Sequence, residues 1–174
     1  SNSDNCMALF YCPSILNDYC LPEAESMHCV RVLRLQKGDQ IEVMDGNGHF
    51  YKAVITDPQP RQCRFEVLEQ WEDRTGPYHA TVAVCPTKNP ERIEWFIEKA
   101  TEVGIHGFAF IRSRYSERKA LKTERVERII ISAMKQSVKA IKPVVQELAP
   151  FESFVKQPFE GQKFICNCQP GKKP

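Results

Sequence analysis

Hydrophobic and polar residues alternate over short stretches in the first half of the chain, which is the pattern of half-buried β-strands. The stretches that predict strands are 9–11, 40–44, 50–55 and 61–68. Residues 45–48 read Asp-Gly-Asn-Gly and accept a positive φ, so they predict a hairpin between the second and third strands. A short helix is expected over 23–33. These elements predict a compact β-rich barrel or open sheet over residues 7–75.

Beyond a polar, turn-rich stretch at 69–79, which we interpret as a linker, the apolar residues become continuous instead of alternating. The runs 80–85, 108–111 and 163–168 predict buried strands. Two segments with helical periodicity separate these runs. Strands that alternate with helices are typical of a parallel sheet with helices on its faces, so residues 76–174 predict an α/β domain.

The ends of both helices carry recognisable signals. Asn89 can cap the first helix, Pro90 fits its first position and Gly104 ends it. Thr123 is the expected cap of the second helix, which must end before Pro143. The residues expected to face the core are Ile93, Phe96, Ile97, Ala100 and Val103 in the first helix and Val126, Ile129, Ile130, Ala133 and Ser137 in the second.

Composition narrows the class of protein. The chain has 174 residues and is 42% hydrophobic, which is enough to build a packed core in one or two domains. It contains no run of 18 apolar residues, so no membrane span is expected. Residues 1–6 lack the basic and apolar regions of a signal peptide, and we therefore expect a cytoplasmic protein.

Eight cysteines are present, and none of them forms a Cys-x-x-Cys pair. In the cytoplasm such thiols stay reduced. Four of the eight, Cys29, Cys63, Cys85 and Cys166, lie in apolar patterns where cysteine acts as a small hydrophobic residue. Cys166 and Cys168 would lie on one face of a strand. A zinc site built from them and a distant histidine is an alternative, but the ligand spacing of known zinc modules is absent, so we expect no metal.

Positive charge is concentrated in one segment. Residues 112–142 contain ten Lys or Arg and three Asp or Glu, a local net charge of +7 against +2 for the whole chain. In an open parallel sheet ligands bind beyond the carboxyl ends of the strands, where loops 86–89 and 112–119 are expected. The segment therefore predicts a polyanion site. The alternative is a solvated basic helix face that binds nothing.

Several motifs together resemble one family. His28-Cys-Val-Arg-Val-Leu-Arg-Leu35, with Lys37-Gly-Asp39 and the residues 45–48, is similar to the N-terminal PUA-like domain of the RsmE family. The segment from Lys88 to Gly104, then Ser116-Glu-Arg118 and Ala133-Met-Lys-Gln-Ser137, resembles the first part of that family's SPOUT methyltransferase domain. The resemblance covers roughly residues 7–170 and implies a PUA-like barrel followed by a SPOUT-type α/β domain.

The resemblance implies S-adenosylmethionine-dependent methylation of N3 of one uridine in the 16S RNA of the small ribosomal subunit, by a cytoplasmic homodimer. The family continues past the end of this chain with a Gly-Pro-Glu-Gly-Gly loop and a knotted segment that bind the methyl donor. Neither the loop nor the knotted segment has a counterpart in residues 1–174. Most of the cofactor site is therefore expected outside the chain, and the resemblance does not imply activity of the 174 residues alone. The competing hypothesis is a non-catalytic RNA-binding module.

Arg118 and Glu117 are the catalytic candidates within this resemblance. N3 of uracil becomes a nucleophile when its proton leaves, and a guanidinium facing the flanking carbonyl oxygens would stabilise the charge that develops. Glu117 could orient the base or take the proton. The alternatives are that Arg118 only holds a phosphate and that Glu117 only neutralises nearby arginines.

The remaining candidates are binding residues. Arg31 and Arg34 are expected one helical turn apart on one face, although a solvated rim that pairs with Glu23 or Glu25 explains them as well. Gln136 and Ser137 are candidates for the cofactor pocket or the dimer partner, or else form a hydrogen bond within the fold. The predicted RNA-binding residues are Arg31, Arg34, Lys37, Lys88, Arg92, Arg112, Arg114 and Lys119.

Overall fold

The computed structural model describes residues 7–76, 78–84, 89–112, 123–150 and 162–166. Contacts divide the chain into two compact units. The N-terminal unit comprises Ser1–Thr75 and the short segment Val138–Ile141, and the sheet unit comprises Gly76–Ser137 and Lys142–Pro174. The expectation of a β-rich part followed by an α/β part with a parallel sheet is confirmed.

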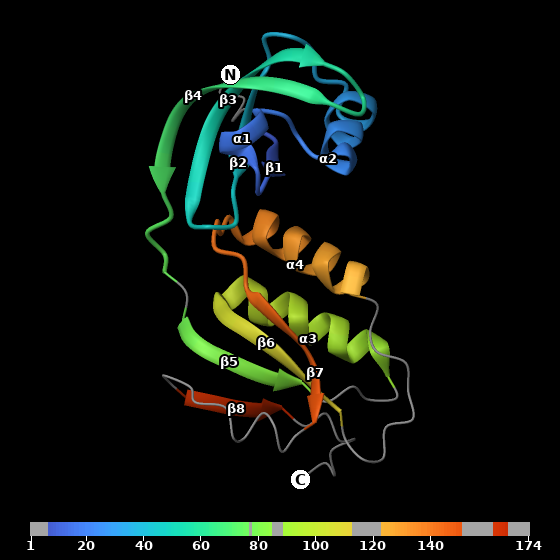
Figure 1. The fold of residues 1–174 in the computed structure, drawn as a ribbon, viewed down its shortest axis with the longest axis vertical. Coiled ribbons are helices and arrows are strands. Elements are labelled where there is room, and N and C mark those ends of the chain that lie inside the picture. The colour runs from blue at the N-terminus through green and yellow to red at the C-terminus, as the bar shows by residue number, and fades with distance from the viewer. Residues whose placement is uncertain (1–6, 77, 85–88, 113–122, 151–161, 167–174) are drawn as a thin grey trace, which may run out of the picture. The chain divides into compact units, whose positions relative to one another are not determined.

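The N-terminal unit is built on a four-stranded sheet of order β1-β2-β3-β4 (Figure 1). Its strands are β1 (Leu9–Tyr11), β2 (Gln40–Met44), β3 (His49–Pro58) and β4 (Cys63–Glu72). β1 pairs with β2 in parallel, and the other neighbours are antiparallel. The helical elements are α1 (Ile15–Asp18), α2 (Glu23–Met27) and the π-helix η1 (His28–Val32).

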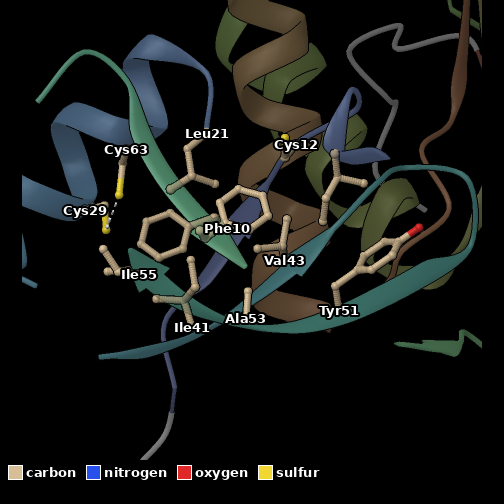
Figure 2. Packing of buried hydrophobic residues seen from close by; sticks show 12 residues of the cluster. Phe10, Cys12, Leu21, Cys29, Ile41, Val43, Tyr51, Ala53, Ile55 and Cys63 are labelled. Atoms are coloured by element: carbon tan, nitrogen blue, oxygen red, sulfur yellow. Dashed lines mark hydrogen bonds between the residues drawn. The ribbon is translucent and has the colours of Figure 1, made fainter. Parts of the chain in front are cut away.

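Alternating residues of the sheet form the core of this unit (Figure 2). The predicted hairpin at 45–48 is confirmed, since Gly46 and Gly48 have φ values of 77° and 94° that favour glycine. The buried residues of the core are Phe10, Cys12, Ile15, Leu21, Cys29, Ile41, Val43, Tyr51, Ala53, Ile55, Cys63 and Phe65.

The sheet unit contains four parallel strands in the order β7-β6-β5-β8 (Figure 1). The strands are β5 (Tyr78–Val84), β6 (Ile105–Arg112), β7 (Val144–Pro150) and β8 (Gln162–Cys166). Helix α3 (Pro90–Val103) contacts β6, and α4 (Thr123–Ser137) packs against α3. In the described part of the chain, no helix combines the length and the apolar character needed to cross a lipid bilayer.

The predicted ends of α3 are confirmed. Asn89 Oδ1 accepts a hydrogen bond from the Glu91 N–H at 3.1 Å, and Gly104 ends the helix at a φ of 96°. The predicted inward face needs a correction, because Val103 is 58% exposed and Thr101 is buried instead. Thr101 satisfies its hydroxyl by donating to the Ile97 carbonyl at 2.7 Å, so a polar residue takes a core position.

The linker, the second helix and one further strand compare with the expectations as follows. β4 continues to Glu72, so the linker is shorter than the predicted 69–79, because strand pairing with β3 extends beyond the apolar alternation. Helix α4 runs from Thr123 to Ser137 and so ends before Pro143 as predicted, and Val138 leaves it with a φ of 53°. Strand β7 was not predicted at all.

Candidate nucleic-acid interface

The polyanion site was predicted at the edge of the sheet where the parallel strands have their carboxyl ends. Val84 at the end of β5 pairs with Phe110 of β6 and with Cys166 of β8, and Arg112 at the end of β6 pairs with Pro150 of β7. All four strands therefore end at the same edge of the sheet. Val84 and Arg112 are the last described residues before the two segments that carry the predicted loop residues.

Both predicted catalytic residues and three of the predicted RNA-binding residues lie outside the described part of the chain. These are the catalytic candidates Glu117 and Arg118 and the RNA-binding candidates Lys88, Arg114 and Lys119. For Arg112 the backbone is described, as the last residue of β6. Arg92 lies in the first turn of α3, near the end of β5 in the chain, and its side chain is exposed without an ion pair to any described acid.

Helix α4 carries three of the ten cations of residues 112–142, and acids neutralise part of their charge. Arg125 binds Glu94 of α3 through two contacts, of which Nη2–Oε2 is 2.9 Å. This hydrogen bond lowers the pKa of Glu94 and raises the pKa of Arg125. Further pairs join Arg128 to Glu124 at 3.9 Å and Lys142 to Glu127. These contacts favour a solvated, paired face for this part of α4 over a continuous phosphate-binding surface.

The cofactor candidates Gln136 and Ser137 are used differently. Ser137 Oγ donates to the Ala133 carbonyl at 2.7 Å, which is the internal hydrogen bond considered as an alternative. Gln136 is exposed and lines an open surface hollow of about 400 Å³ together with Glu98, Arg125, Arg128, Ile129 and Ser132.

This hollow is a poor match for S-adenosylmethionine. A nucleoside cofactor is usually held in a concave, mostly apolar pocket with a few placed polar groups. The hollow is open to solvent, and three charged side chains contribute to its lining. This hollow therefore does not fit the methyl donor by itself.

The predicted basic residues of the N-terminal unit are exposed, but they do not share a helix face. Arg31 lies on η1, whereas Arg34 lies beyond it with a φ of 55°, because the helix has already ended. The Leu35 N–H closes the turn by donating to the Cys29 carbonyl at 3.0 Å. Lys37 follows in the connection to β2 and is exposed as well.

The acids considered as partners of these cations are engaged elsewhere. Glu23 lies 3.9 Å from Arg61, and Glu25 Oε2 accepts a hydrogen bond from the Tyr11 N–H at 2.7 Å. No described acid forms an ion pair with Arg31 or Arg34. These cations keep their charge available to a ligand.

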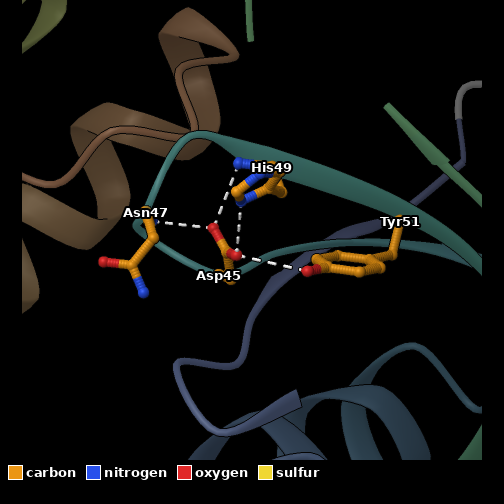
Figure 3. Close-up of polar contacts among 4 residues, drawn as sticks. All are labelled: Asp45, Asn47, His49 and Tyr51. Atoms are coloured by element: carbon orange, nitrogen blue, oxygen red, sulfur yellow. Dashed lines mark hydrogen bonds and ion pairs between the residues drawn. The ribbon is translucent and has the colours of Figure 1, made fainter. Parts of the chain in front are cut away.

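Asp45 organises the hairpin between β2 and β3 (Figure 3). Its Oδ1 accepts from the N–H groups of Asn47 at 2.7 Å and His49 at 3.1 Å. Its Oδ2 accepts from the Tyr51 hydroxyl at 3.2 Å and lies 3.0 Å from His49 Nδ1. Burial raises the pKa of Tyr51 to about 12, and the charge of Asp45 adds to this effect, so the phenol stays protonated as a donor.

One surface feature of the N-terminal unit was missed by the sequence analysis. Trp71 stacks on Phe50 with ring centroids 5.8 Å apart and remains 40% exposed. An open hollow of about 640 Å³ is lined by both rings and by Glu72, Asp73 and Arg74. Trp71 was assigned to the linker because the alternation of β4 ends at residue 68, so the only available signal was the tryptophan itself.

Comparison with known proteins identifies the class. A model described as the RNA methyltransferase PUA domain matches residues 21–68, and a model of the RNA methyltransferase domain matches residues 74–174. The β-rich unit and the parallel-sheet unit thus correspond to the two parts of an RNA methyltransferase. The chain belongs to the RNA methyltransferase family whose curated relatives are called ribosomal RNA small subunit methyltransferase E.

The relatives are longer than this chain. The Aquifex aeolicus ribosomal RNA small subunit methyltransferase E is 28% identical over 158 residues, which cover 88% of this chain and 68% of that protein. The Synechocystis protein of the same name is 32% identical over 143 residues, covering 79% of this chain and 45% of that protein. The chain therefore spans about half to two thirds of these relatives.

Solved structures agree with the family. A probable rRNA-methyltransferase from Porphyromonas gingivalis is 42% identical with a TM-score of 0.78, covering 87% of this chain and 65% of that one. The ribosomal RNA small subunit methyltransferase E from Neisseria gonorrhoeae, bound to S-adenosyl methionine, is 25% identical with a TM-score of 0.73, covering 87% and 66%.

Proposed function

We propose that this chain forms the RNA-binding part and the first part of the catalytic domain of an S-adenosylmethionine-dependent methyltransferase that modifies N3 of a uridine in 16S ribosomal RNA. The observation that carries the proposal is the shared edge where the four parallel strands end, next to the basic segment that begins at Arg112. The donor-bound relative from Neisseria gonorrhoeae supports the choice of cofactor. A substrate in the small ribosomal subunit implies a cytoplasmic enzyme.

The roles of the residues follow from their chemistry. Arg118 would stabilise negative charge on the uracil carbonyl oxygens as the N3 proton leaves, and Glu117 would orient the base or accept that proton. Arg31, Arg34 and Lys37, which are exposed on the N-terminal unit, would hold RNA phosphates there. The donor site would involve residues other than the described ones, together with a second subunit of a homodimer.

The methylated position gives a direct test. A methyl group on N3 blocks the Watson–Crick edge of uridine, so reverse transcription stops there. Ribosomal RNA from cells that lack the gene should lose one such stop in 16S RNA, and a complete copy of the gene should restore it. Identical stops with and without the gene would refute the assigned reaction.

A non-catalytic RNA-binding module is the second candidate, and the exposed cations Arg31, Arg34 and Lys37 of the N-terminal unit favour it. Calorimetry with S-adenosylmethionine separates the two, with the Neisseria gonorrhoeae protein as positive control. If RNA affinity depends on Arg31 and Arg34 but not on Arg118, and the 16S stop does not change with the gene, the binding module is the better account.

A further inference from the structure

Two cysteines from separate elements meet in the core of the N-terminal unit, and the proposed methyl transfer uses neither. Cys29 lies on η1 and Cys63 is the first residue of β4. Both side chains are completely buried, and their Sγ atoms are 3.9 Å apart, joined by a hydrogen bond (Figure 2). The pair is 34 residues apart in sequence, so the fold itself creates the contact.

Backbone hydrogen bonds hold both cysteines in place. The Cys63 N–H donates to Ser26 Oγ at 2.9 Å, and that hydroxyl donates to the Leu21 carbonyl at 2.9 Å. The Cys63 carbonyl accepts from the Leu21 N–H at 2.9 Å, and the Cys29 carbonyl accepts from the Leu35 N–H at 3.0 Å. These hydrogen bonds fix the main chain at both cysteines, and the fixed main chain keeps the two sulfurs close together.

The two thiols differ from the other described cysteines of this unit. Burial raises the pKa of Cys12 to about 11 and also raises the pKa of Cys20, so both disfavour the reactive thiolate. The hydrogen bond from Cys29 lowers the pKa of Cys63 and raises the pKa of Cys29. The geometric observation is the 3.9 Å contact of the two sulfurs, and because their hydrogen bond lowers the pKa of Cys63 we take Cys63 as the attacking sulfur.

We propose that Cys29 and Cys63 are a modification site and form an intramolecular disulfide in the presence of hydrogen peroxide. The Cys63 thiolate attacks one peroxide oxygen, the O–O bond breaks, and a sulfenic acid and hydroxide result. The Cys29 sulfur then attacks the Cys63 sulfur, the S–O bond breaks, and the Cys29 proton leaves with the hydroxyl group as water. In total, two thiols and one peroxide give one disulfide and two waters.

Peroxide is the oxidant that suits this site. It is small enough to reach a buried sulfur through a local opening, whereas a bulky disulfide must expose the pair much further. A disulfide requires the sulfurs to approach to about 2.05 Å, so both side chains must turn toward each other. Cys29 lies in a π-helix, an arrangement that often marks functional sites and is less regular than an α-helix. The inference does not depend on the proposed RNA chemistry.

Peptide mapping tests the proposal on the unaltered chain. Purified protein is treated with hydrogen peroxide, free thiols are alkylated, and the chain is cut after Arg, Lys and Glu without reduction. Cleavage then isolates Cys29 in peptide 26–31 and Cys63 in peptide 62–64. We expect these peptides linked, at their summed mass less two hydrogens, and released by dithiothreitol. Alkylated Cys29 and Cys63, or a link between Cys63 and Cys20, would overturn the proposal.

Two variants test the order of the steps. Cys20→Ala removes the partly exposed thiol nearest in the chain and should leave the yield of the linked peptides within twofold of the wild type. Cys29→Ala should trap Cys63 as a sulfenic acid that dimedone labels, while the wild type accumulates little. Equal dimedone labelling of peptide 62–64 in both proteins would show that Cys29 does not resolve the intermediate and would overturn the proposal.

Discussion

The carboxylate of Asp73 accepts a hydrogen bond from the backbone N–H of Ala140 at 2.8 Å, although 67 residues separate them. The Ala140 carbonyl in turn accepts from the Gly48 N–H at 3.0 Å, and the Gly48 carbonyl accepts from the Asp73 N–H at 2.7 Å. Asn47 and Ile141 form an antiparallel bridge beside these contacts. The hairpin of the N-terminal unit is therefore completed by a segment that follows α4.

Asp73 should make the stability of the N-terminal unit depend on pH in acid. Burial by itself raises the pKa of Asp73, but hydrogen bonds from Thr75 and Ala140 and the charge of Lys139 outweigh it, so the net pKa lies below its ordinary 3.8. The charged form is therefore favoured in the folded state. Its stabilisation is present above pH 3.8 and is lost as the pH falls through the lower folded-state pKa.

Asp73→Asn measures this contribution. We expect the variant to lose about 1–2 kcal/mol of unfolding free energy at pH 7, because it weakens hydrogen bonds to a charged acceptor. Urea unfolding at pH 7, 5 and 3 checks the result, and the difference from the wild type should shrink at the lowest pH. An equal difference at all three values would contradict the assigned role.

Asp45→Asn should destabilise the hairpin more than the removal of one group that donates a hydrogen bond to the Asp45 carboxylate. The amide cannot accept at both positions, so one of its N–H groups would face the Tyr51 hydroxyl and His49. We expect a loss of about 2–3 kcal/mol, against about 1 kcal/mol for the control Tyr51→Phe, which removes a single bond. Chemical denaturation measures both, and equal losses would show that the carboxylate does not act as a shared acceptor.

Gly107→Ala should weaken the pairing of β6 with β7. A methyl group at this position would lie 3.0 Å from the Val144 carbonyl oxygen and 3.3 Å from Thr81 Oγ1. The carbonyl belongs to the neighbouring strand and cannot turn away, so the strands must separate slightly. We expect a loss of about 1–3 kcal/mol, measured by thermal unfolding. An unchanged melting temperature would mean that the sheet relaxes freely at this point.

Arg31→Ala, Arg34→Ala and Lys37→Ala should each weaken RNA binding regardless of sequence. A lysine or arginine that neutralises one phosphate contributes about one unit to the slope of log affinity against log salt. Titration of small-subunit RNA at several salt concentrations measures this slope. Arg61→Ala is the matched control, because Arg61 is exposed in the same unit but is paired with Glu23. A loss for Arg61→Ala as large as for the others would indicate a general charge effect.

Local signals predicted the elements that depend on local chemistry. The positive-φ glycines of the hairpin and the caps at Asn89 and Gly104 require particular residues, so the sequence reveals them. Strand β7 forms because it pairs with β6, and the strand propensity of its residues does not encode that pairing. The nearby Pro143 indicated only the end of a helix. The positive φ of Arg34 and Val138 was hidden for the same reason, since both residue types rarely adopt it.

The sequence predicted where the candidate site lies in the fold, but not how its charged residues are paired. Alternating strands and helices placed two loops at one edge of a parallel sheet, and the register confirms that the strands end together there. Charge counting did not reveal that Arg125 and Arg128 are paired with acids, because the partners come from tertiary contact or from the next helical turn. The roles of Arg118 and Glu117 stay predictions.

The return of residues 138–141 to the N-terminal unit makes its chain discontinuous. A cut after Thr75 would deprive that unit of the partners of Gly48 and Asp73, and a cut after Ile141 would divide the sheet unit between two fragments. Each unit is therefore built from two chain segments, and the segments of the two units alternate along the sequence. A chimera that exchanges the N-terminal unit between relatives would therefore have to exchange residues 138–141 together with it.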